Sequence, residues 1–321
     1  MPYNIRSSDM RIRWIAAFVT AGIALSHSGF AQQPILEYKF NETGTTAPSS
    51  GSDTTPLGML NSSATPTDLH GAAGSGVSGL ATDRAFDNTP GSTMAAGGGV
   101  ALQSGDDNAV DGLLSLTFQG WLNTTAGATG NAGRLFDKND GVGNGYFLGW
   151  NGGTINLQLD LGANVAGASS GGYTSGGNWI FFAATYDGTT GLAKFYQGTT
   201  DTSVSLINTS NVGFTGTVND EAQQLGVGNG AAQSRAFAGL LDDMRIFGST
   251  TDASGVLTVS QLEDLRLSDV PEASTWAMPL LGAGLLVIGG VRRRYRRFKE
   301  ARQGQFSPAK SHVMGVASNN S

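Results

Sequence analysis

The sequence predicts an all-β fold in which many short strands form a sandwich or a barrel. Apolar and polar residues alternate over several short stretches of the chain, as they do in half-buried strands. Turn-forming residues separate these stretches at regular intervals, which is the pattern of an all-β domain. The composition agrees, because the chain of 321 residues holds 48 glycines and only 14% charged residues. We expect one large β domain over residues 32–268.

Alternating segments mark the expected strands. The first lies at 35–40 and the strongest at 113–122, where Leu116 and Phe118 share one face. The stretch 41–66 is rich in Ser, Thr, Gly and Pro and is expected to be a loop. The remaining strands are expected at 81–94, 134–136, 146–150, 154–161, 179–186, 192–196, 221–227 and 236–247, with hairpin turns at 151–153 and 187–188.

One short helix is expected at the C-terminal end of this domain. Ser260 and Glu263 form a capping box, in which each side chain bonds to a free backbone N–H of the other residue. Leu262 and Leu265 then lie where they can pack on the sheet.

Residues 1–31 have the three parts of a secretory signal peptide. Three arginines precede the largely apolar run 14–25, and Gly29 and Ala31 are the small residues before an expected cleavage at Gln32. Twelve residues are too few to span a membrane comfortably, which argues against an uncleaved anchor. Met10 is an alternative start.

A short polar motif, an apolar stretch and a run of arginines follow the predicted helix. The apolar stretch, 276–291, contains no charge and predicts a transmembrane helix, shorter than the roughly 20 residues of an ordinary span. Arginines favour the cytoplasmic side, so the large domain is expected outside the cell. The motif residues are Val270, Pro271, Glu272 and Ala273; the anchor is represented by Trp276, Leu280, Leu285, Val291, Arg292, Arg293 and Arg294.

This three-part order resembles the PEP-CTERM sorting signal of Gram-negative envelope proteins. The resemblance implies export, membrane anchoring and recognition by an exosortase-type transpeptidase in the cell envelope or extracellular matrix. Two features depart from the family pattern. Ala273 stands where the family has proline, and the basic tail 298–321, which we expect to be disordered, continues past the arginines.

Charge and composition exclude several functions. The chain has a net charge of −6, but residues 32–291 alone carry 8 basic and 23 acidic side chains. So acidic a domain repels nucleic acid backbones. Since the chain contains no cysteine, disulfides, thiolate metal sites and a cysteine nucleophile are excluded as well.

Three short segments resemble, in order, parts of the laminin-G-like, concanavalin-A-like family. They are an opening strand and loop at 36–45, a central hairpin at 178–198, and a closing strand and helix at 237–265. The resemblance implies a two-sheet antiparallel β-sandwich of the jelly-roll type, often a calcium ion, and a role in binding sugars or proteins.

Asp242 is the most informative single residue. On an alternating strand it would share a face with Leu240, Met244 and Ile246, in apolar surroundings. A buried carboxylate needs a partner, so we expect either a structural calcium ion, which the resemblance favours, or bonds to backbone donors or a basic side chain. Asp243 would face the other way.

Other polar candidates favour structural roles. Residues 137–141 resemble the start of a calcium loop, but the glycine comes one position early and no acidic residue closes the loop, so a solvated turn is expected. His70, expected in a loop, has no nucleophile elbow to serve. The closely spaced carboxylates that glucanases of this fold carry on one strand are absent.

The aromatic residues Tyr146, Trp150 and Tyr173 could stack on sugar rings, but core positions are the commoner use of aromatics on strands. We therefore expect an exported, membrane-anchored envelope protein that acts in adhesion or binds extracellular polysaccharide or protein, without catalysis. A carbohydrate-active hydrolase or lyase on the same fold, and a structural matrix protein without a discrete site, are the alternatives.

Overall fold

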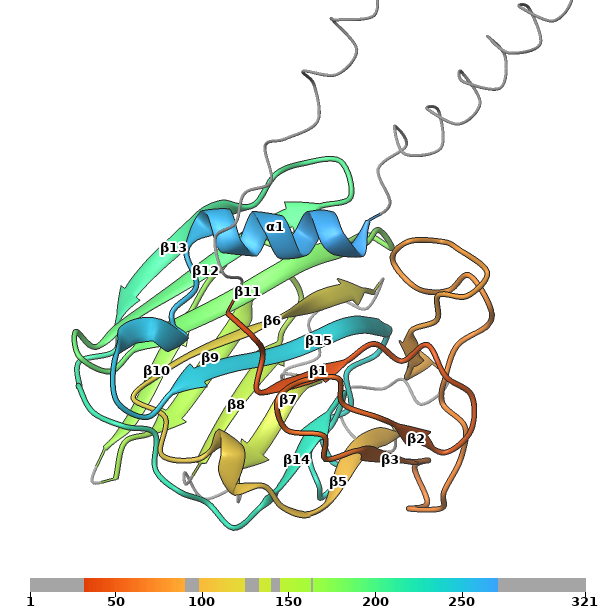
Figure 1. Cartoon of the computed structure of the whole chain (residues 1–321), viewed down its shortest axis with the longest axis horizontal. Coiled ribbons are helices and arrows are strands. Elements are labelled where there is room, and N and C mark those ends of the chain that lie inside the picture. The colour runs from red at the N-terminus through yellow and green to blue at the C-terminus, as the bar shows by residue number, and fades with distance from the viewer. Residues whose placement is uncertain (1–31, 90–97, 125–132, 140–144, 163, 271–321) are drawn as a thin grey trace, which may run out of the picture. The chain divides into compact units, whose positions relative to one another are not determined.

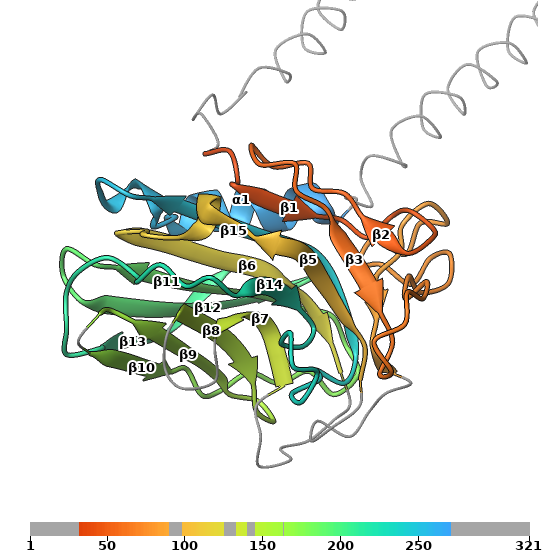
Figure 2. The ribbon, with the colours of Figure 1, turned by 90° about the horizontal axis from the view of Figure 1, so that it is seen from below.

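Two antiparallel sheets pack face to face and enclose one apolar core (Figures 1 and 2). The computed structural model describes residues 32–89, 98–124, 133–139, 145–162 and 164–270. The sandwich lies in Met1–Arg266, the first of two units into which the chain divides. The expected all-β sandwich with one short helix is confirmed.

The first sheet has seven strands in the order β1-β15-β6-β11-β12-β13, with β4 also paired to β15. Its central hairpin is β11 and β12, as expected, and β6 pairs with β11 along eight residues. The strands are β1 (Leu36–Tyr38), β4 (Phe86–Asp87), β6 (Ser115–Asn123), β11 (Ile180–Asp187), β12 (Leu192–Thr199), β13 (Ser205–Asn211) and β15 (Leu240–Ser249).

The second sheet has eight strands in the order β10-β9-β8-β7-β14-β5-β3-β2. Two of them, β2 and β3, lie in the stretch 41–66, so the expectation of a plain loop there is wrong. Their lengths, two residues for β2 and four for β3, explain why alternation did not reveal them. The strands are β2 (Thr46–Ala47), β3 (Leu57–Leu60), β5 (Val100–Asp106), β7 (Gly133–Asn139), β8 (Gly145–Trp150), β9 (Ile155–Asp160), β10 (Val165–Ser169) and β14 (Gln224–Val227).

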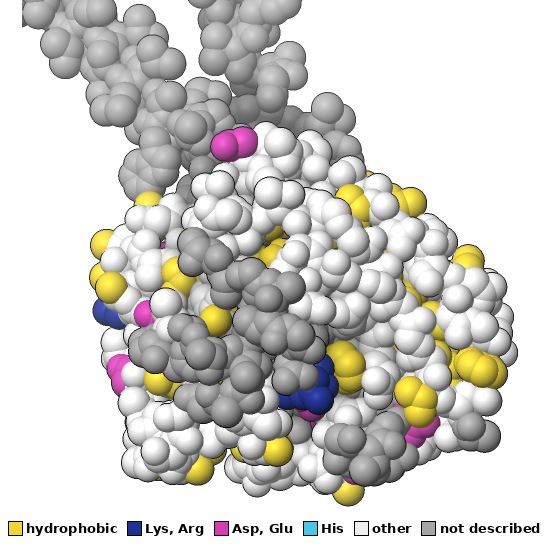
Figure 3. Space-filling model, turned by 180° about the vertical axis from the view of Figure 1, so that it is seen from behind, with side chains coloured by type: hydrophobic (Ala, Val, Ile, Leu, Met, Phe, Trp, Pro, Cys, Tyr) yellow, Lys and Arg dark blue, Asp and Glu magenta, His cyan; other side chains and the backbone are white. Residues whose placement is uncertain are grey.

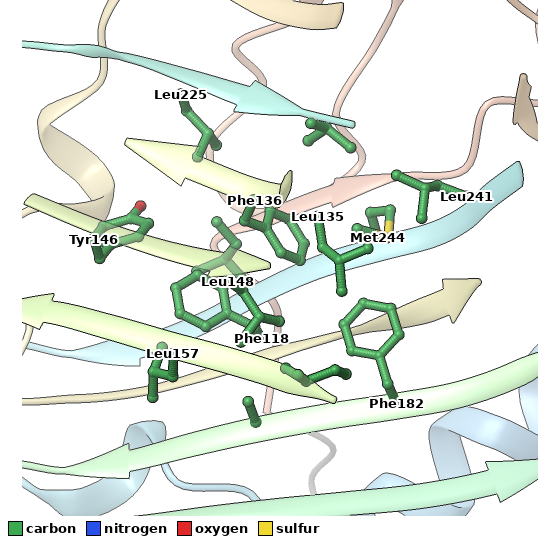
Figure 4. Packing of buried hydrophobic residues seen from close by; sticks show 14 of the residues in the cluster. Phe118, Leu135, Phe136, Tyr146, Leu148, Leu157, Phe182, Leu225, Leu241 and Met244 are labelled. Atoms are coloured by element: carbon green, nitrogen blue, oxygen red, sulfur yellow. The ribbon is translucent and has the colours of Figure 1, made fainter. Parts of the chain in front are cut away.

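Aromatic rings from both sheets meet in the core (Figure 4). The ring of Phe118 on β6 lies 5.2 Å from that of Phe136 on β7 and 5.2 Å from that of Tyr146 on β8. Phe182 and Met244 complete this region from β11 and β15. Burying a side chain of this size stabilises the fold by about 1.5 to 3 kcal/mol.

The outer face of the seven-stranded sheet is covered. Helix α1 (Val259–Asp269) lies over this face (Figures 1 and 2). The short 3-10 helix η3 (Ala253–Gly255) is bonded to strand β6 of the same sheet, because the Thr117 hydroxyl donates a hydrogen bond to the Gly255 carbonyl. The α1 residues Glu263 and Arg266 bond to backbone groups of Val204 and Thr199. A second 3-10 helix, η2 (Asn108–Val110), follows β5.

The capping box of α1 lies two residues earlier than expected, at Thr258 and Gln261. The Thr258 hydroxyl accepts a bond from the Gln261 N–H at 3.3 Å, and the Gln261 side chain accepts one from the Thr258 N–H at 2.9 Å. The expected pair is therefore wrong, because Ser260 already lies inside the helix and Glu263 pairs with Arg266 at 2.7 Å.

The expected signal peptide and the span 276–291 lie outside the described residues. Over the ranges given above, the structure contains no helix with the length and apolar character of a membrane span.

Candidate ligand-binding face

The outer face of the eight-stranded sheet carries a row of paired residues that crosses four strands. Asp137 on β7 is paired with Phe147 on β8, Phe147 with Gln158 on β9, and Gln158 with Gly167 on β10. Alternate residues of a strand point to opposite faces. Since Tyr146 and Leu148 point into the core, this row points outward.

Two hollows adjoin along this row. The first, of about 460 Å³, lies where β7 and β8 meet the segment 230–235, and the second, of about 580 Å³, lies over β9 and β10. Phe147 and Gln158 line both, so the hollows form one groove across the sheet. Figure 3 looks onto this side of the molecule, where basic side chains gather beside apolar surface.

Arg134 organises the first hollow. Its guanidinium carbon lies 3.4 Å from the centre of the Phe147 ring, and its Nε atom donates to the carboxylate of Asp137. Stacking on a ring and pairing with a carboxylate are both suited to the flat guanidinium group. Its Nη1 atom is buried and has no hydrogen-bond partner among the described residues.

The charges of this hollow affect one another. Burial lowers the pKa of Arg134, against the attraction of Asp137, and the nearby Arg235 lowers it further. Burial raises the pKa of Asp137, although Arg134 and Arg235 both act to lower it. The hollow thus contains two cationic side chains and one carboxylate among its lining residues.

Asp242 lies on the other sheet, and on the face opposite to the one expected. A β-bulge between Asp242 and Arg245 inserts an extra residue, and Asp243 there adopts a φ of 47°. Beyond the bulge the alternation is out of phase. Asp242 consequently pairs with Trp121 on the outer face, whereas Met244 and Ile246 belong to the core.

The fully buried Asp242 carboxylate is held by backbone donors, which was one of the expected arrangements. It accepts bonds from the N–H groups of Val77 at 2.8 Å and Asp243 at 2.9 Å. Burial raises the pKa of Asp242 well above its usual range, and the charges of Asp243 and Asp83 raise it further. Arg245 pairs with Asp243 at 3.3 Å.

The negative charges of the residues around Asp242 would suit a bound calcium ion. Each of its oxygens keeps a lone pair after accepting one N–H bond, and the surplus of negative charge favours a cation. Backbone oxygens would have to supply most other ligands, because the one group of three converging carboxylates in the described residues lies elsewhere, at Asp106, Asp111 and Asp220.

This second acidic group surrounds a buried lysine. The ammonium group of Lys138 on β7 lies 2.7 Å from the Asp106 carboxylate and 2.9 Å from that of Asp111, and it also bonds to the Glu221 carbonyl. Burial raises the pKa of Asp111 to about 6, and Asp220 and Asp106 contribute to the rise, against the effect of Lys138.

Three other predictions can be compared with the structure. The solvated turn predicted from Asp137 is wrong for 137–139, which belong to β7, and residues 140–141 lie outside the described residues. Tyr146, Trp150 and Tyr173 are core residues, 1 to 4% exposed, so the expected core role is confirmed.

His70 lies outside the named strands and forms an isolated β-bridge with Phe86. Its Nδ1 atom lies 2.8 Å from the Asp68 carboxylate. Val270 directly follows α1. The other predicted sorting and anchor residues, from Pro271 to Arg294, lie outside the described residues.

Sequence reasoning did not single out Arg134, Phe147, Gln158 or Arg235. A signal was present for two of them. Once Tyr146, Leu148 and Trp150 are assigned to the core, alternation turns the large apolar Phe147 outward, where such a residue is conspicuous. Gln158 follows in the same way on β9. Arg134 and Arg235 line the same hollow because of an irregularity in β7 and the course of the loop that carries Arg235. The periodicity of the sequence predicts neither feature.

Comparisons with known proteins give one family match and several structural likenesses. The family profile described as the concanavalin A-like lectin/glucanases superfamily (Laminin_G_3) matches residues 95–256. No curated protein sequence matches the chain.

Among solved structures, the binding domain of Paraclostridial Mosquitocidal Protein 1 is similar at 10% identity and a TM-score of 0.48, covering 74% of this chain and 52% of that one. The binding domain of botulinum neurotoxin DC in complex with rat synaptotagmin II is 15% identical, with a TM-score of 0.48 and coverage of 74% and 51%. A SAP-like pentraxin from Limulus polyphemus is 18% identical, with a TM-score of 0.36 and coverage of 50% and 72%. The chain spans about half the length of the two toxin structures.

Proposed function

Because the chain belongs to the concanavalin A-like lectin/glucanases superfamily, we propose that it is a binding protein that recognises a glycan outside the cell. The binding site is the groove on the outer face of the eight-stranded sheet. Binding there requires no chemical step.

The row from Asp137 through Phe147 to Gln158 carries this proposal. A flat aromatic ring suits the C–H face of a sugar, and amide and carboxylate side chains next to it can bond to sugar hydroxyls. The opposite sheet offers no such face, since α1 and the segment of η3 cover its described outer surface.

A glycan and protein array probed with the full chain tests the proposal. Phe147→Ala is expected to reduce binding to the recognised glycan at least tenfold. Phe214→Ala is the matched control, because Phe214 is an exposed phenylalanine, 41% accessible, that lines neither hollow. Silence of the array toward every glycan would favour a structural matrix protein without a discrete site.

The absence of a catalytic pair in the described lining supports a non-catalytic role. Glycoside hydrolysis ordinarily needs two carboxylates that flank the scissile bond. Asp137 is the single described carboxylate in the two hollows, and it is bonded to Arg134. Hydrolysis of a polysaccharide panel by the purified protein would instead establish the hydrolase or lyase alternative.

A structural calcium ion at Asp242 is a second part of the proposal. The three carboxylates of Asp242, Asp243 and Asp83 support it, because Arg245 is paired with one of them, Asp243, and the charges of Asp243 and Asp83 both act on Asp242. The ion would be held by the Asp242 carboxylate and by backbone oxygens, and it would fix the loop around Val77 to β15. It would supply no chemistry to the groove.

We also propose that the protein is exported and sorted to the cell envelope. Residues 1–31 support export, and the order of Pro271-Glu272-Ala273, the apolar stretch and Arg292–Arg294 supports recognition by an exosortase-type transpeptidase. Intact mass of the protein from its native host tests this. A mature form from Gln32 to near Glu272 is expected, whereas a membrane form that retains Arg292 would contradict processing.

A further inference from the structure

We propose that two copies of the chain pair through strand β10, so that their eight-stranded sheets join edge to edge and their grooves meet at Gly167. Strand β10 is the last strand of its sheet and has one neighbour, β9, among the described strands. The pairing goes beyond the proposed function and does not depend on it. Three features of β10 support it, namely its outward backbone groups, its lack of charge and its place at the end of the groove.

The outward backbone groups of β10 belong to every second residue. The Ser170 N–H bonds to the Ile155 carbonyl at 2.9 Å, directly beyond the ladder of β9 and β10, and this bond sets the phase of the ladder. Bonded and non-bonded pairs alternate along an antiparallel ladder. Since Ser170 bonds toward β9, the odd-numbered residues Val165, Gly167 and Ser169 turn their N–H and C=O groups away from it. All three of these residues are exposed.

The β10 edge has none of the features that usually prevent an edge strand from pairing. Such strands are commonly protected by charged side chains, by proline or by a bulge. Strand β10 holds no charge and no proline, and its register with β9 is continuous over all five residues. The neighbouring edge strand β13 is different, because its register with β12 shifts. A bond from the Asn208 side chain to the Ser169 carbonyl, 2.8 Å long, leaves a second lone pair on that oxygen.

Charge favours a second copy of this chain as the occupant of the edge. Residues 32–291 carry 23 acidic and 8 basic side chains, so two copies in general repel each other. The segments 161–186 and 202–219 hold no charged side chain, and they contain the neighbouring edge strands β10 and β13 (Figure 2). Two equally acidic domains can approach at this neutral margin, whereas a basic peptide would be drawn to the acidic surface elsewhere.

Pairing about Gly167 satisfies the edges of both copies at once. A twofold axis at Gly167 places this residue opposite its own equivalent, and it places Val165 opposite Ser169 of the second copy. Each outward N–H group of these three residues then faces an outward C=O group. No like charges come together, which would destabilise an antiparallel pair. The contact is closed, because each copy uses its single β10 edge.

The groove runs across the strands and reaches β10 at Gly167. This residue is paired with Gln158, which follows Phe147 in the row described above. In the dimer the row continues from Gly167 into the second copy and ends at Asp137 of that copy. Strands lie about 4.8 Å apart, so the eight strands of the joined row form a surface roughly 34 Å long. Each copy thereby contributes its Phe147 and Gln158 to one shared surface.

Sedimentation of the full chain in detergent tests the pairing, and charges placed at the axis locate it. The wild type is expected to sediment as a dimer. Gly167→Lys and Gly167→Asp should each raise the dissociation constant of the dimer at least tenfold, because like charges then lie directly opposite each other. An equimolar mixture of the two variants should regain the dimer, since opposite charges attract across the axis. Gly105→Lys, on β5, is the control that should stay dimeric, because a Cβ at either glycine meets nothing within 4 Å.

A single cysteine measures the distance across the axis. The chain contains no cysteine, so Gly167→Cys introduces the only one. Opposed residues of a hydrogen-bonded antiparallel pair have Cα atoms about 5.5 Å apart, which a disulfide can bridge. Mild oxidation is therefore expected to link most Gly167→Cys chains into dimers. Chains with Gly105→Cys should remain unlinked.

A monomeric wild type would overturn the inference, and so would a dimer that neither Gly167→Lys nor Gly167→Asp weakens. Both outcomes leave the proposed function standing, because the array tests the groove of a single copy. Silence of the array together with disulfide-linked Gly167→Cys dimers would remove the proposed function and support the pairing.

Discussion

The ammonium group of Lys138 lies 2.9 Å from the carboxylate of Asp111, at a place where both side chains are buried and the lysine is fully so. Lys138 is paired with Tyr146 across β7 and β8, so it points into the sandwich rather than to solvent. Its charge is balanced by Asp106 and Asp111 at the rim of the core.

Lys138→Met is expected to lower the free energy of unfolding by about 3 to 5 kcal/mol, because removal of one partner leaves buried charge uncompensated. Chemical denaturation at pH 7 measures the change. Lys39→Met is the control, since the Lys39 side chain is 48% exposed and its 3.7 Å pair with Glu37 is long. We expect that variant to stay within about 0.5 kcal/mol of the wild type. A loss below 1 kcal/mol for Lys138→Met would contradict the role given to the buried pair.

Asp111 is expected to make stability depend on pH between about 4 and 6. Its folded pKa of about 6 is above the ordinary aspartate value of about 3.9, so the folded state binds this proton more tightly than the unfolded chain does. The stabilisation from this proton is complete below pH 4 and is lost as the pH rises through 6. The difference in unfolding free energy between wild type and Asp111→Asn should therefore shift against the wild type over that interval. A difference that is constant from pH 4 to 7 would show that the pKa of Asp111 is not raised.

The start of α1 offers a matched pair of variants. Thr258→Ala removes the hydroxyl that accepts from the Gln261 N–H and should cost about 1 kcal/mol. Ser260→Ala, two residues later and also exposed, should change stability by less than about 0.5 kcal/mol. Thermal or chemical unfolding of both proteins decides between Thr258 and Ser260 as the cap. The opposite order would place the start of the helix two residues later.

Calcium is expected to raise the melting temperature of the wild type at pH 7.5 through Asp242. Asp242→Asn should abolish the increase, because the amide cannot supply the negative charge that a cation needs. Asp220→Asn tests the competing acidic group of Asp106, Asp111 and Asp220, and it should respond to calcium as the wild type does. If only Asp220→Asn loses the response to calcium, the ion binds at the group of Asp106, Asp111 and Asp220 instead.

The sequence predicts those features of the fold that are decided by residues close together along the chain. Alternation places Leu116 and Phe118 correctly on the core face of β6, because a regular strand keeps period two over its length. The same rule is wrong for Asp242, where one inserted residue near Asp243 reverses the faces of everything beyond it. A bulge leaves no periodic trace in the sequence.

The groove is harder to predict than the strands that build it. Phe147 and Asp137 are neighbours because β7 and β8 pair in one register, interrupted by another irregularity between Arg134 and Phe136. Arg235 joins them from a segment about 100 residues away in sequence. Such contacts follow from topology, and topology is decided by the packing of the whole core.

The position of α1 over one sheet affects how many ligands one domain can bind at once. Of the two broad faces that the described sandwich presents, one is occupied by its own helix, and the groove lies on the other. Under the proposed function, the two described faces of each domain therefore provide one binding groove. On that proposal, cross-linking of two ligand chains would require two copies of the protein, and the avidity of a surface would depend on how densely the copies are displayed there.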